Sequence, residues 1–255
     1  MKILLSNDDG YFAEGLIKLA KALSREHDVF VCAPSAERSG AGHGLTLGGG
    51  LNWQGESEVG FIEGHDGKKI PCRAVYGSPA DAVKFAIQHL YKTRKFDLVM
   101  SGVNSVLNIG TDIMYSGTYA AAEEGTILGV PSIAVSTAAK KGGYDTAVEF
   151  AVRNLDALMK HIRPFVTVNV NVPFNDKEKL RGVKVTAVGV RHYDDWYEKT
   201  PAGFRLKGYP YDCSASDKDD DCRWSDCGYI TVSPVRIVSA DEECLRAMRA
   251  ERWQL

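Results

Sequence analysis

The sequence lacks any apolar run long enough to cross a bilayer, since a spanning helix needs about 18 consecutive apolar residues. It also lacks a secretory signal peptide, because its apolar start is short and runs straight into Asp8 and Asp9. Basic clusters are missing, and the formal net charge of −2 is not that of a nucleic-acid-binding protein. We therefore expect a cytoplasmic protein whose partners are neither membranes nor duplex nucleic acid.

Several catalytic and nucleotide-binding motifs are also absent. The sequence contains no G-x-G-x-x-G after a strand, no G-x-x-x-x-G-K-[ST], no H-E-x-x-H and no G-x-S-x-G. Gly40, Gly42 and Gly44 resemble a dinucleotide-binding loop only superficially, because the third glycine comes one position early. The chemistry must therefore come from another arrangement of residues.

Cysteine is present but forms no recognisable framework. Six cysteines in a chain without a signal peptide are expected to be reduced thiols. Cys222 and Cys227 have a spacing that resembles zinc ligands, but Cys213 and Cys244 supply no second close pair. We expect free thiols and no structural zinc.

Apolar strands alternate with amphipathic helices through the first two thirds of the chain. Hydrophobic residues make up 44% of the sequence and charged residues 25%, as is ordinary for a globular protein. Strands separated by helices indicate an α/β fold, with a mostly parallel sheet and helices on both faces. The expected strands are 2–6, 28–33, 97–102, 132–136 and 166–173, and the expected helices are 13–25, 79–92, 117–128 and 144–162.

Beyond residue 180 the pattern becomes β-rich. Residues 183–190 alternate with period two, a hairpin or extended arm follows, and another strand is expected at 228–234. The acidic residues 217–221 between them read as a solvated loop. This region is too short and too polar in its middle to have a core of its own. We therefore expect one domain over the whole chain, made of an α/β core (1–180) and a β-rich extension with a C-terminal segment (181–255).

Polar loops follow three of the expected strands. The first is Asn7-Asp8-Asp9-Gly10, the second contains Ser39 and Gly40, and the third runs from Asn104 to Asn108. Ligands of an open parallel sheet bind beyond the carboxyl ends of the strands, so these loops should meet at one edge. Carboxylate, hydroxyl and amide oxygens suit Mg²⁺, Mn²⁺ or Ca²⁺, and a divalent cation lets two adjacent carboxylates coexist.

Each of these features also has a plainer explanation. Asn, Asp and Gly are common in strand-to-helix turns, Ser-Gly is common in loops, and asparagines such as Asn104 and Asn108 often cap helices. Their coincidence at one edge of the sheet favours the metal site over the turn. His43 is expected to support the loop rather than bind the metal.

A second signal points to an anion beside that metal. Ser116 or Thr118 is expected to cap a helix, and a helix N-terminus binds phosphate through its free N–H groups. Gly40 and Gly42 would let the backbone approach the same anion closely. A metal, a helix terminus and glycine-rich loops around one crevice suit a phosphoester.

Several motifs in fixed order resemble the SurE family of survival-protein nucleotidases. The resemblance extends from the N-terminus to V-N-V-N-V-P at 168–173 and G-Y-I-T-V-S-P at 228–234, so that it covers nearly the whole chain. The other motifs are M-K-I-L-L-S-N-D-D-G, A-P-x-x-x-x-S-G-A-G, G-S-P-A-D-A-V, S-G-V-N-x-x-x-N-I-G and Y-S-G-T-x-x-A-A-x-E-G.

The resemblance implies a Rossmann-like three-layer α/β/α fold and a phosphatase that depends on a divalent metal such as Mg²⁺, Mn²⁺ or Co²⁺. Members of the family release phosphate from nucleoside monophosphates. They form homodimers by exchanging a C-terminal arm, and some assemble into tetramers. By motif match, the metal ligands are Asp8, Asp9, Ser39 and Asn104, and the phosphate-binding residues are Gly40, Asn108, Ser116, Gly117 and Thr118.

The chain departs from the family pattern at two single positions and in the turn near 213–227, which is cysteine-rich and acidic here. Val106 replaces a glycine in the Asn104–Asn108 loop and could stiffen or reshape it, and Ala82 replaces a cysteine after Asp81. We predict a metal-dependent nucleotidase in which Asp8 and Asp9 are catalytic. The alternatives are a phosphohydrolase of non-nucleotide phosphoesters or short polyphosphate, and a non-catalytic metal- or nucleotide-binding member of the family.

Overall fold

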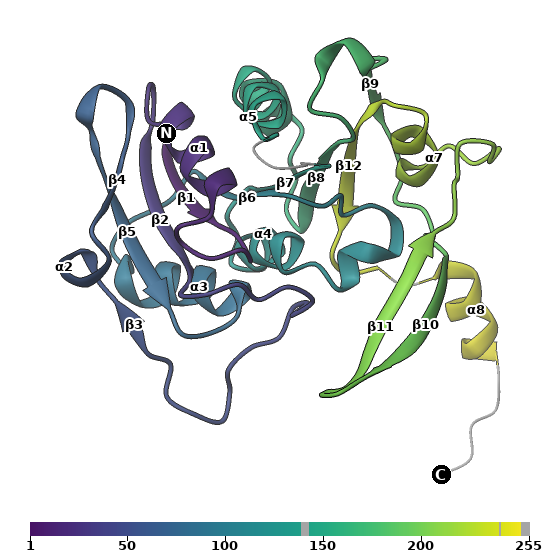
Figure 1. The fold of residues 1–255 in the computed structure, drawn as a ribbon, viewed down its shortest axis with the longest axis horizontal. Coiled ribbons are helices and arrows are strands. Elements are labelled where there is room, and N and C mark those ends of the chain that lie inside the picture. The colour runs from purple at the N-terminus through teal and green to yellow at the C-terminus, as the bar shows by residue number, and fades with distance from the viewer. Residues whose placement is uncertain (139–142, 240, 251–255) are drawn as a thin grey trace.

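The computed structural model describes residues 1–138, 143–239 and 241–250 (Figure 1). Within them, ten strands form one sheet, in the order β3-β5-β2-β1-β6-β7-β8-β12-β9, with β4 also paired to β5. The strands are β1 (Lys2–Ser6), β2 (Asp28–Pro34), β3 (Trp53–Gln54), β4 (Phe61–Glu63), β5 (Lys69–Val75), β6 (Leu98–Asn104), β7 (Ser132–Thr137), β8 (Val166–Val172), β9 (Val183–Val185) and β12 (Ile230–Arg236).

The central strands run parallel, from β5 through β2, β1, β6 and β7 to β8. In the described part of this sheet, antiparallel pairs occur only towards the sides, where β3 and β4 pair with β5 and β12 pairs with β8. Because the parallel strands end at the same edge, the loops after β1, β2 and β6 open on one side of the sheet. The predicted α/β fold with a mostly parallel sheet is confirmed.

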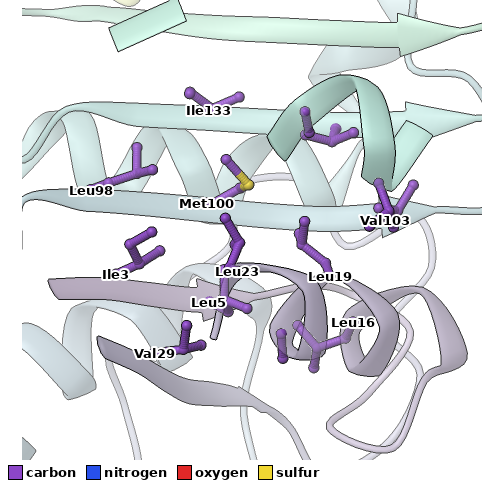
Figure 2. Close-up of a cluster of buried hydrophobic side chains, with 14 of the residues drawn as sticks. Ile3, Leu5, Leu16, Leu19, Leu23, Val29, Leu98, Met100, Val103 and Ile133 are labelled. Carbon is purple, nitrogen blue, oxygen red and sulfur yellow. The ribbon is translucent and has the colours of Figure 1, made fainter. Parts of the chain in front are cut away.

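Helices cover both faces of this sheet. They include α1 (Glu14–Leu23), α3 (Pro79–Phe85), α4 (Gly117–Ile127), α5 (Asp145–Arg153) and α6 (Leu155–Lys160). Figure 2 shows Leu16, Leu19 and Leu23 of α1 packed against Ile3 and Leu5 of β1. Leu4 points to the opposite face and packs in a second cluster with residues of α3 and α4, as the period-two alternation of a strand requires.

The remaining helices complete the described chain. They are α2 (Glu56–Val59), α7 (Asp221–Asp226) and α8 (Glu242–Ala250), together with η1 (His65–Gly67), η2 (Ala86–Leu90), η3 (Gly110–Met114) and η4 (Lys177–Lys179). In the described residues, no helix is both long and apolar enough to cross a membrane. All six cysteines are free thiols, as predicted.

One expected helix is divided in the structure, and strand β5 was missed. The helix expected at 144–162 is interrupted at Asn154, whose side-chain amide donates to Phe150 O at 2.8 Å between α5 and α6. Strand β5 was not predicted, although it pairs with β2. Its alternating buried residues, Ile70, Cys72 and Ala74, are obscured in the sequence by the proline and arginine between them.

The extension beyond residue 180 is divided between the sheet and an arm. Strands β9 and β12 continue the main sheet, while β10 (Tyr193–Thr200) and β11 (Gly203–Pro210) form a separate hairpin that projects from it (Figure 1). Every residue of β11 is exposed, and so are most of β10. The hairpin expected from the sequence is therefore present.

The acidic residues before β12 are only in part the expected solvated loop, because residues 217–219 are exposed but Asp220 and Asp221 are buried. Asp220 caps α7 by accepting a hydrogen bond from Arg223 N at 3.0 Å, and Asp221 is fully buried. The Asp221 carboxylate accepts hydrogen bonds from Gly110 N and Gly189 N, at 3.0 and 2.8 Å. Through these two hydrogen bonds, the buried carboxylate joins the start of η3 to the segment that precedes the hairpin.

Candidate active site

The first acidic residue after β1 is at the centre of the site. Asp8 is 5% exposed, and its carboxylate accepts a hydrogen bond from the Thr118 hydroxyl. The backbone carbonyl of Asp8 also accepts from Arg38 N, at 2.7 Å. The turn is closed by Asn7, whose Nδ2 donates to the carbonyl of Gly10 at 2.9 Å. Asp8 is thereby held by both the loop after β2 and helix α4.

Helix α4 begins directly against Asp8. Ser116 is its N-cap and accepts a hydrogen bond from Tyr119 N at 3.0 Å. A Cβ at Gly117 would lie 2.7 Å from Asp8 Cβ, so only glycine allows this approach. The first backbone N–H groups of an α-helix have no partner within the helix and carry a partial positive charge. The helix start therefore offers anion-binding groups beside the carboxylate.

The loop after β2 lies over the same helix start. Gly42 N donates to Tyr115 O at 3.1 Å, which attaches the loop to the residue before the N-cap. Gly40 and Gly42 both have left-handed backbone conformations, with φ of +73° and +54°. Ser39 is exposed, and its hydroxyl donates to Glu37 Oε1 at 2.7 Å. The hydroxyl oxygen can still act as a ligand.

The third loop begins at the end of β6, the strand next to β1. Asn104 and Asn108 are each 8% exposed. Asn104 Nδ2 donates to Val106 O at 2.7 Å, which leaves Oδ1 as its potential metal ligand. Asn108 is bound by the neighbouring strands, since its Nδ2 donates to Ser136 Oγ and its backbone N to Asn171 Oδ1, both at 2.8 Å. In this structure the Asn108 amide positions the loop.

The site carries uncompensated negative charge. Burial is the main cause that raises the pKa of Asp9 to about 6. The negative charges of Asp8 and Glu37 raise this pKa further. Burial also raises the pKa of Asp8 and outweighs the hydrogen bond from Thr118. Like charges held this close are relieved by a cation.

An ion cluster next to the site was not foreseen from the sequence. His43 Nδ1 is 2.7 Å from Glu123 Oε2, and its Nε2 is 2.8 Å from Glu124 Oε2. Lys84 Nζ also lies 2.6 Å from Glu124, which is 1% exposed. Hydrogen bonds to Glu123 and Glu124 raise the pKa of His43 to about 9. The cluster joins the loop that carries Ser39 to α4 and α3.

Sequence reasoning placed His43 in a supporting role but gave it no partners. Its partners lie about 80 positions away along the chain, and only the fold brings them together. Among the described residues, Asp220, Asp221 and Cys222 form a group of potential metal ligands that lie close together. Backbone N–H groups already occupy carboxylate oxygens of both of these aspartates, so the cluster has a structural explanation.

The comparisons with known proteins agree with the motifs. The family model described as "Survival protein SurE" matches residues 3–195. The chain belongs to the SurE family. This SurE protein is 40% identical to the 5′-nucleotidase SurE of Alkaliphilus metalliredigens over 92% of each chain. It is 38% identical to that of Fervidobacterium nodosum over 97% of this chain and 96% of the relative.

A solved structure supports the same assignment. The crystal structure of the SurE protein from Aquifex aeolicus matches with a TM-score of 0.81 and 30% identity, over 98% of both chains. The predicted family and fold are therefore confirmed for this SurE protein.

Proposed function

We propose that this SurE protein is a divalent-metal-dependent phosphomonoesterase that hydrolyses nucleoside monophosphates to a nucleoside and phosphate. The observation that carries the proposal is the contact between Asp8 and the start of α4, where a buried carboxylate and an anion-binding helix terminus meet. The names of the similar proteins, 5′-nucleotidase SurE, support the same activity and substrate class.

The residues present fit a hard divalent cation. Asp8, Asp9, Ser39 and Asn104 would hold it, since their free oxygens are the ligand type that Mg²⁺ and Mn²⁺ prefer, and Co²⁺ is a further candidate. The negative charges around Asp9 also call for a cation. When bound, such an ion neutralises charge on a phosphoryl group and lowers the pKa of a water molecule.

The side chains and backbone of α4 would bind the phosphoryl group. The N–H groups at Gly117 and Thr118 and the Ser116 hydroxyl would stabilise its oxygens as charge redistributes. Gly40 would bring the backbone of the loop after β2 close to the same oxygens. Asp8 or Asp9 would orient the attacking water and accept its proton. Asn108 is assigned to the phosphate by motif, and its bonds to Ser136 and Asn171 support a role in holding the loop.

The exposed hairpin supports a homodimer. Trp196, Tyr197, Phe204 and Tyr209 are 43–71% exposed in the single chain. Contiguous exposed apolar surface of this kind marks interaction sites, and aromatic residues are enriched in interface cores. We propose that each subunit lends β10 and β11 to its partner, and that two such dimers can pair into a tetramer. The cytoplasmic location stays a prediction from the sequence.

The test is phosphate release from a panel of nucleoside monophosphates and glycerol phosphate, with Mg²⁺, Mn²⁺ or Co²⁺ added and with chelator. Asp8→Asn keeps the shape of the side chain but removes a negative ligand, so activity should fall by orders of magnitude while the fold persists. Asp66→Asn, at an exposed position far along the chain, is the matched control. Full activity of Asp8→Asn at saturating metal would refute the proposed site.

A further inference from the structure

The loop after β2, which carries Ser39 and Gly40, buries little of its own surface. Residues 36–46, all of them described, are exposed or half-buried. Apart from its chain neighbours, a Cβ added at Gly40 would meet no atom within 4 Å. Glycine loses more conformational freedom on folding than any other residue, and Gly40, Gly42 and Gly44 alternate through this segment. Contacts other than hydrophobic burial must therefore keep the loop against helix α4.

His43 is the side chain that fastens this loop to helix α4. Its Nδ1 lies 2.7 Å from Glu123 Oε2, and its Nε2 lies 2.8 Å from Glu124 Oε2. Hydrogen bonds to the two glutamates raise the pKa of His43 to about 9, so the ring is protonated at neutral pH and donates from both nitrogens. Glu124 is 1% exposed and is also bound by Lys84, at 2.6 Å. Charge-assisted hydrogen bonds of this kind are roughly twice as strong as neutral ones.

Other contacts hold the loop mainly at its two ends. At its start, Arg38 N donates to the carbonyl of Asp8 at 2.7 Å. At its end, Thr46 donates from its backbone N and its hydroxyl to the Asp81 carboxylate, at 2.9 and 2.7 Å. Between these ends lie the ion pairs of His43 and two hydrogen bonds made by the loop backbone. His43 is therefore the charged side chain that ties the middle of the loop to α4.

This attachment has a consequence for binding. Ser39 is a proposed metal ligand and Gly40 a proposed phosphate contact, and both lie within four residues of His43. The apparent affinity for a ligand falls with the fraction of molecules that have the binding conformation. Without His43, metal and phosphate would have to order the glycine-rich loop as they bind, and their affinity would decrease. Once bound, the same ligands hold the loop, so the rate at saturation would change little.

We propose that His43 is a positioning residue of the active site, which holds the loop that carries Ser39 and Gly40 ready to bind metal and phosphate before either arrives. The inference rests on the proposed function, because it concerns the same metal and the same phosphate. It gives the ion pairs with Glu123 and Glu124 an effect on ligand affinity in addition to their effect on stability.

The test compares wild type with His43→Gln and with the milder Glu123→Gln, which keeps the contacts of Glu124 and should fold even if His43→Gln does not. The control for reduced stability is Thr126→Val. It removes the buried hydrogen bond between the hydroxyls of Thr126 and Thr167, at 2.7 Å, near the end of α4 that lies away from the phosphate site. Calorimetry measures the binding of Mn²⁺ and of inorganic phosphate, and kinetics give KM and kcat for a nucleoside monophosphate at saturating Mn²⁺.

A further readout needs no ligand. Arg38 is exposed and precedes Ser39 directly, so trypsin can cleave between them when the loop opens. The rate of this cleavage, mapped by mass spectrometry, reports the population of the open loop when opening and closing are fast. Cleavage at other exposed lysines and arginines provides the internal reference, since a general loss of stability would accelerate cleavage throughout the chain.

His43→Gln should weaken binding of Mn²⁺ and phosphate about tenfold, which corresponds to about 1.4 kcal/mol, and should raise KM by a similar factor. Its kcat should stay within about twofold of the wild-type value. Cleavage after Arg38 should become severalfold faster relative to the other sites. Glu123→Gln should give smaller changes in the same direction, and Thr126→Val should resemble the wild type in every one of these measurements.

Unchanged binding of Mn²⁺ and phosphate by His43→Gln, or a loss that Thr126→Val reproduces, would overturn the inference. So would cleavage after Arg38 that is no faster than in the wild type, because the loop would then stay in place without His43. A wild type that binds Mn²⁺ and phosphate but releases no phosphate from nucleoside monophosphates would refute the proposed function alone, since binding and proteolysis still decide the role of His43. A wild type that binds neither would refute both.

Discussion

Replacing His43 with glutamine should destabilise the protein by about 2 kcal/mol near neutral pH. The ion pairs with Glu123 and Glu124 raise the pKa of His43 from its ordinary 6.5 to about 9. At 1.36 kcal/mol for each pKa unit, that change corresponds to roughly 3 kcal/mol of preference for the charged form. The side chain of His43 is 24% exposed, so screening by solvent reduces this figure. Glutamine keeps a polar side chain but has no charge.

The effect should depend on pH in a defined direction. A group whose pKa is raised by folding contributes its full stabilisation below its unfolded pKa and loses it as the pH rises through the folded pKa. The difference between wild type and His43→Gln should therefore be largest below about pH 6.5 and should shrink as the pH passes about 9. Burial opposes ionisation of Glu124, but hydrogen bonds from His43 and Lys84 outweigh it and lower its pKa. The advantage of the wild type is thus kept down to mildly acidic pH.

Urea unfolding followed by tryptophan fluorescence, at a series of pH values between about 6 and 10, measures this difference. His65→Gln is the control, because His65 makes its ion pair with Asp66 at an exposed turn. A difference between wild type and His43→Gln that is the same at every pH would refute the reasoning, since the effect would then not come from the charge of His43.

Three further predictions concern the helix start and the hairpin. Ser116→Ala should raise KM and weaken inhibition by phosphate, and it should lower stability by about 1 kcal/mol through the lost N-cap; unchanged inhibition would show that the anion binds elsewhere. Thr118→Val should weaken metal binding as well, because Asp8 loses its hydrogen-bond donor. Deleting residues 193–211 should give monomers or aggregates of lower activity by light scattering and phosphate release, and a soluble, fully active monomer would contradict the proposed exchange of hairpins.

The core of the fold could be predicted because its strands are short apolar runs and its helices have clear periodicity. Strand β1 and helix α1 are examples, with Leu16, Leu19 and Leu23 on the buried face. Strand β5 could not be recognised, since Pro71 and Arg73 interrupt its apolar residues. Its place in the sheet depends on pairing with β2 and β4, and such pairing is not encoded in any local window.

The part of the candidate site that the sequence predicts is the convergence of the loops that follow the parallel strands. Parallel strands place Asp8, Ser39 and Asn104 at one edge, so their convergence follows from the order of the elements. The burial of Asp221 was not predictable, because an acidic run usually remains in water. Its two backbone donors, Gly110 and Gly189, come from segments that are far apart in the sequence. Long-range hydrogen bonds of this kind have no signature in the sequence.

Val106, which replaces the glycine of the family pattern, has a simple place in the structure. Val106 is 65% exposed. Among the described residues, the non-glycine residues with positive φ are Asp66 and Phe165, so Val106 does not need the backbone freedom of glycine. Its carbonyl oxygen accepts a hydrogen bond from Asn104 Nδ2 at 2.7 Å, and Asn108 Nδ2 lies 3.5 Å from the same oxygen. A valine can make these backbone contacts as well as a glycine does.

The substitution Val106→Gly should therefore lower stability without improving catalysis. Glycine gains more freedom in the unfolded chain, which costs about 0.5–1 kcal/mol where the native backbone does not need it. The measurements are urea unfolding and the kcat/KM for a nucleoside monophosphate, with Val238→Gly, another exposed valine, as a control for the loss of a side chain. A severalfold rise in kcat/KM would show instead that valine distorts the loop that carries both asparagines.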